Sequence, residues 1–282
     1  MPPPGHDLLL AAIRDDPDDD TLRLAYADWL DEHGDAERAE FVRVQCRLAA
    51  LGHGPLWPHA GLKEASALAG RLSDEQAGLV LRQAELWELN RDGWLAELPE
   101  LSHCTVLFHR GFAAEVVVSE NPGALVRNGA RLFPAAPVTR VVFRDCTPDA
   151  VELGLLSPWF DTIRGLTVGW HRPPAGAGNR VAEVVAGAPY LAGLRDLSLF
   201  GVAMANPGAH DVAAAPFARR LVRLDLAQNE IRDSGAMAIA RAIDPARLRV
   251  LDLTGNPLTD VMRNTLRRQL GDRAYVEGGE EG

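Results

Sequence analysis

The chain has 282 residues, a hydrophobic share of 47% and a formal net charge of −10, from 39 acidic and 29 basic residues. This length suits about two domains, and the hydrophobic share is sufficient for a packed core. The acidic balance argues against a nucleic-acid-binding protein, because phosphate contacts require a stripe of basic side chains.

The first 50 residues have the pattern of three short amphipathic helices. The first spans Asp7 to Arg14, and Pro17 within an acidic run prevents it from continuing. Asp20 or Thr21 is expected to cap the second helix, where carboxylates favour the positive end of the helix dipole. Its expected apolar face consists of Leu22, Ala25, Tyr26, Trp29 and Leu30.

The third helix is expected to follow Gly34, a C-cap residue, with Asp35 as its N-cap. Its apolar face consists of Phe41, Val44, Leu48 and Leu51. The three helices are therefore expected to pack together.

Two features of the second helix admit more than one interpretation. Tyr26 and Trp29 form either a part of the core or a peptide-binding aromatic patch, and their helical spacing favours the core. Asp28 is expected to cap a helix or to pair with Arg23.

This N-terminal stretch resembles the repeat-companion domain, a bacterial family. The resemblance rests on Asp16 to Thr21, on Arg23 to Leu30 with its Y-A-D-W-L core, and on Arg38 to Gln45. Arg110-Gly111-Phe112 resembles a further element of the family. The resemblance implies no known catalytic activity, and it implies that leucine-rich repeats often follow.

Between residues 52 and 118 the pattern changes. Gly52 to Pro58 is rich in glycine and proline and is expected to form a loop. Ser73-Asp74-Glu75-Gln76 fits a capping box, which predicts a helix running to about Asn90. Phe112 to Val118 is expected to be a strand.

A short pattern recurs near the C-terminus. Leu221 to Ile231 and Leu248 to Leu258 both read L-x-x-L-x-L-x-x-N-x-I/L, at an offset of 27 residues. Looser copies begin at Leu194, Ile163 and Val138. This period lies within the range of leucine-rich repeats.

The spacing has a physical cause. The last two leucines of the pattern lie two apart, so a strand points both of them to the same side. Asn229 and Asn256 follow the strands, where an amide side chain can satisfy buried backbone groups. Cys146 occupies the same position in an earlier copy and is expected to bond more weakly.

The remainder of each repeat is expected to be helical. Ala236, Ile239, Ala240 and Ile243 have helical spacing, and Asp233 or Ser234 is expected to be the N-cap. A strand plus a helix in about 27 residues resembles the ribonuclease-inhibitor type of leucine-rich repeat. Val261 to Leu270 is the expected last helix, and Ala274-Tyr275-Val276 is a candidate closing strand.

The side chains between the inward leucines are expected to line a concave sheet. They form either a selective polar surface or cross-strand pairs that keep the sheet soluble. Trp170 and Phe200 are expected at the ends of strands. Each is either a binding hot spot or a residue that packs beneath the loop from Arg172 to Gly176. The candidate partner-binding residues are Trp170, Phe200, Arg140, Arg144, Asp196, Arg223, Asp225 and Asp252, and Val142, Thr167 and Ser198 line the same sheet.

Motifs for catalysis or metal binding are incomplete. His53 with His59, and His103-Cys104 with His109, each lack the ligands that a metal site requires. The acidic run at Asp15 to Asp20 lacks the glycine and distal glutamate of an EF-hand. No nucleophile-elbow or P-loop pattern occurs. We therefore expect no catalytic residue, cofactor or metal.

The expected location is the bacterial cytoplasm. No apolar run reaches the length of a membrane helix, and the first residues lack the basic region of a secretory signal. Three cysteines without C-x-x-C spacing fit reduced thiols.

The expected fold class is α/β. A short leucine-rich-repeat solenoid, with parallel strands inside and helices outside, follows an N-terminal all-α domain. The expected divisions are 1–100 for the helical domain, 101–137 for a transition region, 138–276 for the repeats and 277–282 for a polar tail.

The expected function is non-enzymatic binding of an unidentified protein partner on the concave face, without nucleic acid or membrane. The alternatives are an enzyme with a site between the two parts and a structural assembly domain. The sequence does not fix the oligomeric state.

Overall fold

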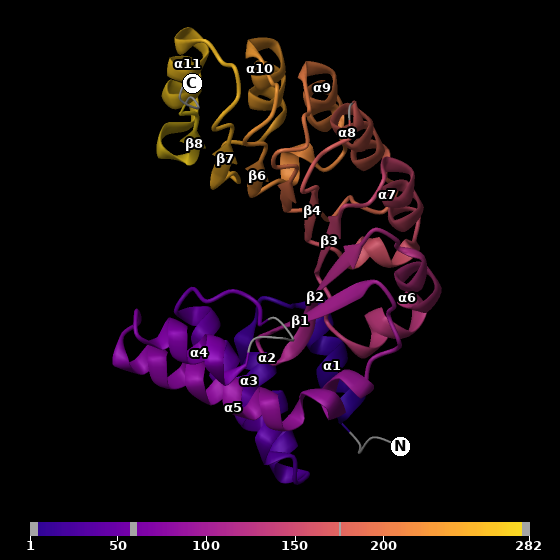
Figure 1. Cartoon of the computed structure of the whole chain (residues 1–282), viewed down its shortest axis with the longest axis vertical. Helices are drawn as coiled ribbons and strands as arrows, with labels where there is room; N and C mark the ends of the chain where they lie inside the picture. Colours follow the sequence, from indigo (N-terminus) through magenta and orange to yellow (C-terminus); the bar gives the residue numbers. More distant parts are fainter. Residues whose placement is uncertain (1–4, 57–60, 175, 278–282) are drawn as a thin grey trace. The chain divides into compact units, whose positions relative to one another are not determined.

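The computed structural model describes residues 5–56, 61–174 and 176–277 (Figure 1). Over these residues the chain forms eleven α-helices and eight β-strands, which confirms a mixed α/β protein. The chain divides into two compact units. Unit 1 comprises residues 1–117 and 128–139, and unit 2 comprises residues 118–127 and 140–282.

Five helices and a strand pair make up most of unit 1. β1 and β2 are neighbours joined by a turn at Arg110 and Gly111, both of which have positive φ. β2 and α6 contribute residues to both units. The elements are α1 (His6–Asp15), α2 (Asp20–Glu32), α3 (Ala36–Ala50), α4 (Leu62–Ala69), α5 (Asp74–Ala96), β1 (Cys104–His109), β2 (Phe112–Ser119) and α6 (Gly123–Ala135).

The first three helices form where the sequence predicts them, with their caps nearly as expected. Asp35 accepts a hydrogen bond from the backbone N–H of Arg38, which confirms it as an N-cap. α2 is capped one residue earlier than predicted, because the side chain of Asp19 accepts from the N–H of Thr21. Gly34 has a φ of 87°, as expected of the residue after a helix.

The buried face of α2 differs from the predicted one. Ala25 is exposed, whereas Arg23 and Ala27 are buried together with Tyr26 and Leu30. These four positions lie at i, i+3, i+4 and i+7, so the face keeps helical spacing and includes an arginine. The prediction was wrong only for Ala25, since Leu22 and Trp29 also pack against the core, and it missed Arg23 because arginine is rarely buried.

An aromatic cluster joins α3, α5 and β1. The ring centroids of Phe41 and Trp94 lie 4.5 Å apart, and those of Trp87 and Phe108 lie 4.9 Å apart. Trp94 is buried, so α5 continues to Ala96 rather than ending near Asn90. The capping box at Ser73 is confirmed.

Unit 2 repeats a strand followed by a helix. β3 to β8 pair in chain order and in parallel, and Figure 1 shows α7 to α11 following one another along one side of these strands. The strands are β3 (Arg140–Arg144), β4 (Gly165–Gly169), β5 (Asp196–Ser198), β6 (Arg223–Asp225), β7 (Val250–Asp252) and β8 (Ala274–Tyr275). The helices are α7 (Pro148–Leu155), α8 (Ala177–Gly187), α9 (Asn206–Ala214), α10 (Asp233–Ala242) and α11 (Asp260–Leu270), with short 3₁₀ turns at Pro158–Thr162, Ala218–Arg220 and Gly271–Arg273.

The aliphatic side chains of successive copies stack in register. Leu197, Leu224 and Leu251 are Cα partners across β5, β6 and β7. Leu226 and Leu253, two residues further along their copies, are fully buried. The predicted last helix and closing strand are confirmed by α11 and by β8, which pairs with β7.

The asparagine of the repeat satisfies buried backbone groups, as predicted. The side chain of Asn229 accepts from the N–H of Met204 and donates to the carbonyl oxygens of Leu199 and Leu226 at 2.7–3.0 Å. Asn256 makes equivalent bonds one repeat later. The thiol of Cys146 lies 3.6–3.7 Å from two carbonyl oxygens, a weaker version of the same arrangement.

A second ladder of side chains connects the helix starts. Oδ1 of Asn179 accepts from the N–H groups of Ala205 and Gly208, at the start of α9. Asn206 does the same for Arg232 and Gly235, at the start of α10. The expected cap at Asp233 or Ser234 was therefore wrong for α10, because the capping side chain comes from the preceding repeat. Asp233 instead accepts from the N–H of Thr259, one repeat later.

Candidate functional site

On one side of the sheet of unit 2, two lines of side chains alternate along the strands with the buried leucines. We call this surface the strand face. Strand alternation places these side chains on the opposite side of the sheet from the leucines. A first line runs across Arg140, Gly165, Asp196, Arg223 and Val250, and a second across Val142, Thr167, Ser198, Asp225, Asp252 and Tyr275.

Arg140 and Asp196 form an ion pair across an intervening strand. Nη2 of Arg140 lies 2.9 Å from Oδ2 of Asp196, although β4 lies between their strands. Gly165 makes this possible, because a Cβ at that position would lie 2.6 Å from Cζ of Arg140. The first line is thus partly self-paired.

The carboxylates of the second line are held by their own chain. The hydroxyl of Ser198 donates to Asp225 at 2.8 Å. The other oxygen of Asp225 accepts from the backbone N–H two residues later, and Asp252 does likewise. These bonds fix the carboxylates in orientations that leave them half-buried.

Arg223 differs from the charged residues of the strand face described above, which are held by ion pairs or hydrogen bonds. Its side chain is exposed and forms no ion pair with the residues that the structure describes. On the second line, Tyr275 stands opposite Asp252 and is 52% exposed. Tyr275 was not among the predicted binding residues. Strand alternation within the expected strand of residues 274–276 is the signal that would have placed its side chain on the strand face.

The two candidate aromatic residues differ in their surroundings. Nε1 of Trp170 donates to the carbonyl oxygen of Cys146 at 2.9 Å, and the ring is half-buried. Phe200 follows β5 and is 53% exposed. Trp170 is therefore tied to the turn of the preceding repeat, whereas Phe200 offers a free apolar surface.

Arg144 lies at the end of β3, opposite Gly169, and is half-buried. The next residue, Asp145, accepts from the backbone N–H and from the ring of His171 at 2.9 Å and 2.6 Å. These hydrogen bonds lower the pKa of Asp145. The pair closes the turn after β4.

The residues that carry the N-terminal resemblance meet inside unit 1. The N–H of Gly111 donates to Oε1 of Gln45 at 2.7 Å. Gly111 has a φ of 88°, and a Cβ there would lie 2.8 Å from Cα of Val42, so the position requires glycine. Arg110 donates to the carbonyl oxygen of Asp18 at 3.2 Å. These motif residues therefore have a structural role.

The expected pairing of Asp28 with Arg23 was wrong. Asp28 pairs with Arg43 at 2.7 Å. Arg23 is buried, donates to the carbonyl oxygen of Pro17 at 2.7 Å and lies over the Phe112 ring at 5.2 Å from its centroid. Burial lowers the pKa of Arg23 to about 10.

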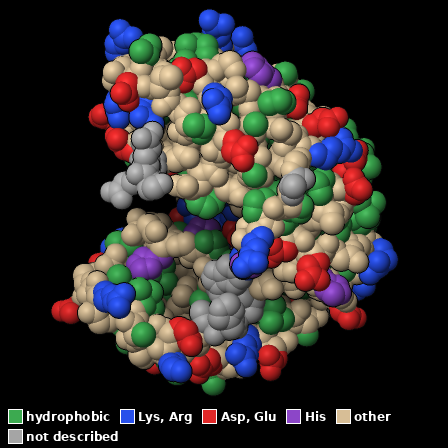
Figure 2. Space-filling model, turned by 45° about the horizontal axis from the view of Figure 1, so that its top comes forward, with side chains coloured by type: hydrophobic (Ala, Val, Ile, Leu, Met, Phe, Trp, Pro, Cys, Tyr) green, Lys and Arg blue, Asp and Glu red, His purple; other side chains and the backbone are tan. Residues whose placement is uncertain are grey.

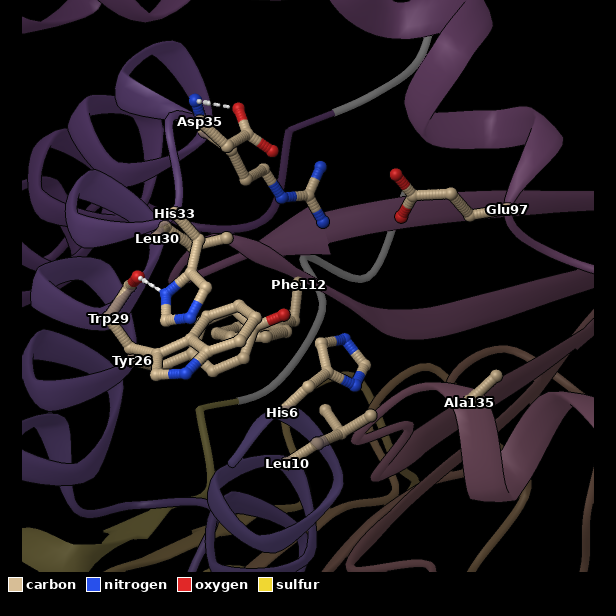
Figure 3. A pocket seen from close by; sticks show the side chains of 11 residues that line it. His6, Leu10, Tyr26, Trp29, Leu30, His33, Asp35, Glu97, Phe112 and Ala135 are labelled. Atoms are coloured by element: carbon tan, nitrogen blue, oxygen red, sulfur yellow. Dashed lines mark hydrogen bonds between the residues drawn. The ribbon is translucent and has the colours of Figure 1, made fainter. Parts of the chain in front are cut away.

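Unit 1 also contains a cavity of about 270 Å³, drawn in Figure 3. Tyr26, which is buried in the core as expected, and the half-buried Trp29 both line it. The lining residues are His6, Leu10, Tyr26, Trp29, Leu30, His33, Asp35, Arg38, Glu97, Phe112 and Ala135.

Three or more potential metal ligands do not cluster anywhere in residues 5–56, 61–174 and 176–277. His59 lies outside these ranges, and so do residues 278–282 of the expected polar tail. None of the described helices combines the length and apolar composition that spanning a bilayer requires.

A family model described as Leucine Rich repeat matches residues 219–240 and 247–261. The matched segments contain β6, most of α10, and β7, so the two clearest copies of the sequence pattern are leucine-rich repeats. No curated protein matches the chain.

Proposed function

We propose that unit 2 is a protein-interaction module that binds a partner on its strand face. Leucine-rich repeats generally mediate protein–protein interaction, and the family match lies within this unit. In this proposal the stacked repeats form a short solenoid of the ribonuclease-inhibitor type, and the strand face is its concave surface.

The exposed Arg223 is the observation that carries the proposal. Arg140 and Asp196 neutralise each other, whereas Arg223, the next position along the same line, forms no ion pair with the described residues. Phe200 and Tyr275 each expose about half of an aromatic side chain. Arginine and tyrosine are enriched among residues that dominate binding energy.

The mechanism is rigid presentation. The strand-face carboxylates are already oriented by Ser198 and by backbone N–H groups. Binding to a preformed surface requires less ordering of side chains, which lowers the entropic cost of association. Trp170, Arg144 and Arg140 then shape the edge of the surface rather than anchoring the partner.

The protein acts without catalysis, cofactor or nucleic acid, and it acts in the cytoplasm. Figure 2 shows acidic and basic side chains interspersed on the face that it draws, and such a mixed surface fits a protein partner better than a polyphosphate.

We also infer that the N-terminal helices belong to a repeat-companion domain. The meeting of Gly111 with Gln45 gives the family residues a common structural purpose. The proposed divisions remain residues 1–100, 101–137, 138–276 and 277–282. The N-terminal domain would then support the repeat array rather than perform chemistry.

A capture experiment tests the proposal. The full-length chain, immobilised, is expected to retain a specific protein from a lysate of the source cells. Arg223→Glu is expected to reduce retention at least tenfold, whereas Arg241→Glu, an exposed arginine on α10, is the matched control. Equal loss in both variants, or loss in neither, would contradict the proposal.

A further inference from the structure

Arg38 is the most unusual residue of the unit 1 cavity. Its side chain is 9% exposed and lines the cavity. Among the described residues it forms no ion pair, and its Nη1 is buried without a hydrogen-bond acceptor. A buried charged group without an acceptor is costly, so the position calls for a functional explanation.

Aromatic rings stabilise the positive charge of Arg38, but they do not accept hydrogen bonds from the N–H groups that lie in the plane of the guanidinium. Its Cζ lies 4.6 Å from the centroid of Trp94 and 5.3 Å from that of Phe108. Such contacts compensate for part of the desolvation. Because an aromatic face accepts no in-plane hydrogen bond, the N–H groups of Nη1 still lack an acceptor.

The neighbouring carboxylates do not serve as that acceptor. Asp35 caps α3 through the backbone N–H of Arg38. Glu97 is exposed and lies beyond ion-pair distance of the guanidinium, although its negative charge opposes the lowering of the pKa of Arg38 by burial. Neither carboxylate therefore supplies the acceptor that Nη1 of Arg38 lacks.

The remaining walls of the cavity are aromatic. Tyr26, Trp29 and His33 form a continuous stack, with interplanar angles of 22° and 23° (Figure 3). His6 meets the first two edge-on, with centroids 5.7 Å away. A flat ring has favourable faces and edges to pack against in such a site.

We propose that this cavity binds a carboxylate attached to an aromatic ring, with Arg38 receiving the carboxylate and the stack receiving the ring. A guanidinium can donate two parallel hydrogen bonds to the two oxygens of a carboxylate. The volume of about 270 Å³ lies just below the usual range of ligand sites, so it admits one ring and its acid group. The site concerns unit 1 alone and does not depend on the partner proposed for unit 2.

Binding of N-acetyl-L-phenylalanine to the full-length chain tests the proposal. Titration calorimetry is expected to show binding of the acid at least tenfold tighter than that of its uncharged amide, because only the acid satisfies the guanidinium. Equal affinities, absence of binding, or binding restricted to the cation trimethyl-lysine would each overturn the proposal.

A surface variant makes the test independent of folding. Glu97→Gln removes a negative charge from the cavity lining and is expected to strengthen binding of the acid by about two- to fivefold at low salt. Glu100→Gln, an exposed glutamate three residues away that does not line the cavity, is the matched control and is expected to change nothing. Unchanged or weaker binding by Glu97→Gln would overturn the carboxylate assignment.

Arg38→Gln is expected to abolish binding, and circular dichroism establishes whether the variant folds. If it does not fold, the Glu97 comparison decides. A peptide ending in phenylalanine with a free carboxylate distinguishes the sources: tighter binding of the peptide indicates a protein C-terminus, and tighter binding of the small acid indicates a free metabolite. Either result supports the carboxylate site.

Discussion

The two units treat their buried polar groups in opposite ways. In unit 2, Asn229 and Asn256 are buried, and both ends of each amide are hydrogen-bonded to backbone groups. In unit 1, Arg23 and Arg38 are buried, and each has N–H groups without an acceptor. A repeated side chain whose hydrogen bonds are all made to the backbone serves the architecture of the repeats. A unique buried charge left unsatisfied points to a requirement beyond folding.

The partly unsatisfied cluster of unit 1 extends this contrast. Buried atoms without a partner also occur in Asp20 and Arg110, whereas the one such atom found in the described part of unit 2 belongs to Arg263. Arg110 lies 3.5 Å from Asp20, and Arg23 lies 3.9 Å from it, so the charges are mutually close but imperfectly bonded. The buried thiol of Cys46 lies within the influence of these charges, so it is the group through which this cluster is expected to respond to pH.

The stacking of unit 2 is broken most severely by a charge in its core. Leu224→Asp places a carboxylate at a fully buried position and is expected to destabilise the unit by more than about 4 kcal/mol. Urea unfolding followed by circular dichroism measures the loss. Arg223→Asp, at the exposed neighbouring position, is the control, and a well-folded Leu224→Asp protein would refute the register of the repeats.

Removal of one amide tests the self-satisfied position directly. Asn229→Ala leaves the N–H of Met204 and the carbonyl oxygens of Leu199 and Leu226 without their partner. We expect a loss of about 3 kcal/mol in the free energy of unfolding. Asn264→Ala, on the exposed side of α11, is expected to change stability by less than about 0.5 kcal/mol. Similar losses in both would mean that the buried ladder contributes little.

The pH response of unit 1 is expected to show at Cys46. Burial and the nearby negative charge of Asp20 raise the pKa of its thiol from about 9.0 to about 12. Above pH 9 the unfolded state has released this proton while the folded state keeps it, so stability falls as pH rises. The loss between pH 8 and pH 10 is about 1 kcal/mol.

Urea unfolding at several pH values measures this slope, and Cys46→Ala is expected to flatten it. Tyr26, whose pKa burial raises to about 12, adds a further loss above pH 10, whereas the lowered pKa of Arg23 acts in the opposite direction there. The comparison is therefore made below pH 10. An unchanged slope in Cys46→Ala would exclude the thiol as its source.

The smallest expected effect concerns the ion pair of the strand face. Gly165→Ala pushes the end of the Arg140 side chain away from Asp196, at a cost below about 1 kcal/mol because the pair is partly exposed. Arg140→Ala is expected to cost a similar amount, and the double variant no more than either single one. Additive losses in thermal unfolding would show that the glycine serves another purpose.

The sequence predicts unit 2 well because its contacts repeat at short range. A period of 27 residues and the paired leucines place the strands, and the asparagine bonds follow from side-chain chemistry. The cap ladder was missed although Asn179, Asn206 and Asp233 share the same spacing. A helix start is normally assigned to its own first residues, so a cap supplied by the preceding repeat is not considered.

Unit 1 was less predictable because its key contacts join distant segments. Gly111 meets Gln45 across 66 positions, and Arg110 reaches Asp18 across 92. Helical periodicity ranks arginines as exposed, so neither Arg23 nor Arg38 entered the expected core. The cavity therefore had no signal in the sequence beyond the aromatic spacing of Tyr26 and Trp29.

The most direct test of the account is photo-crosslinking from the strand face. A photoreactive amino acid at position 223 of the full-length chain is expected to form a covalent adduct with one discrete protein in a lysate of the source cells. The same amino acid at position 241, on the helix side, is expected to form none. Adducts of equal yield from both positions, or an adduct from position 241 alone, would contradict recognition by the strand face.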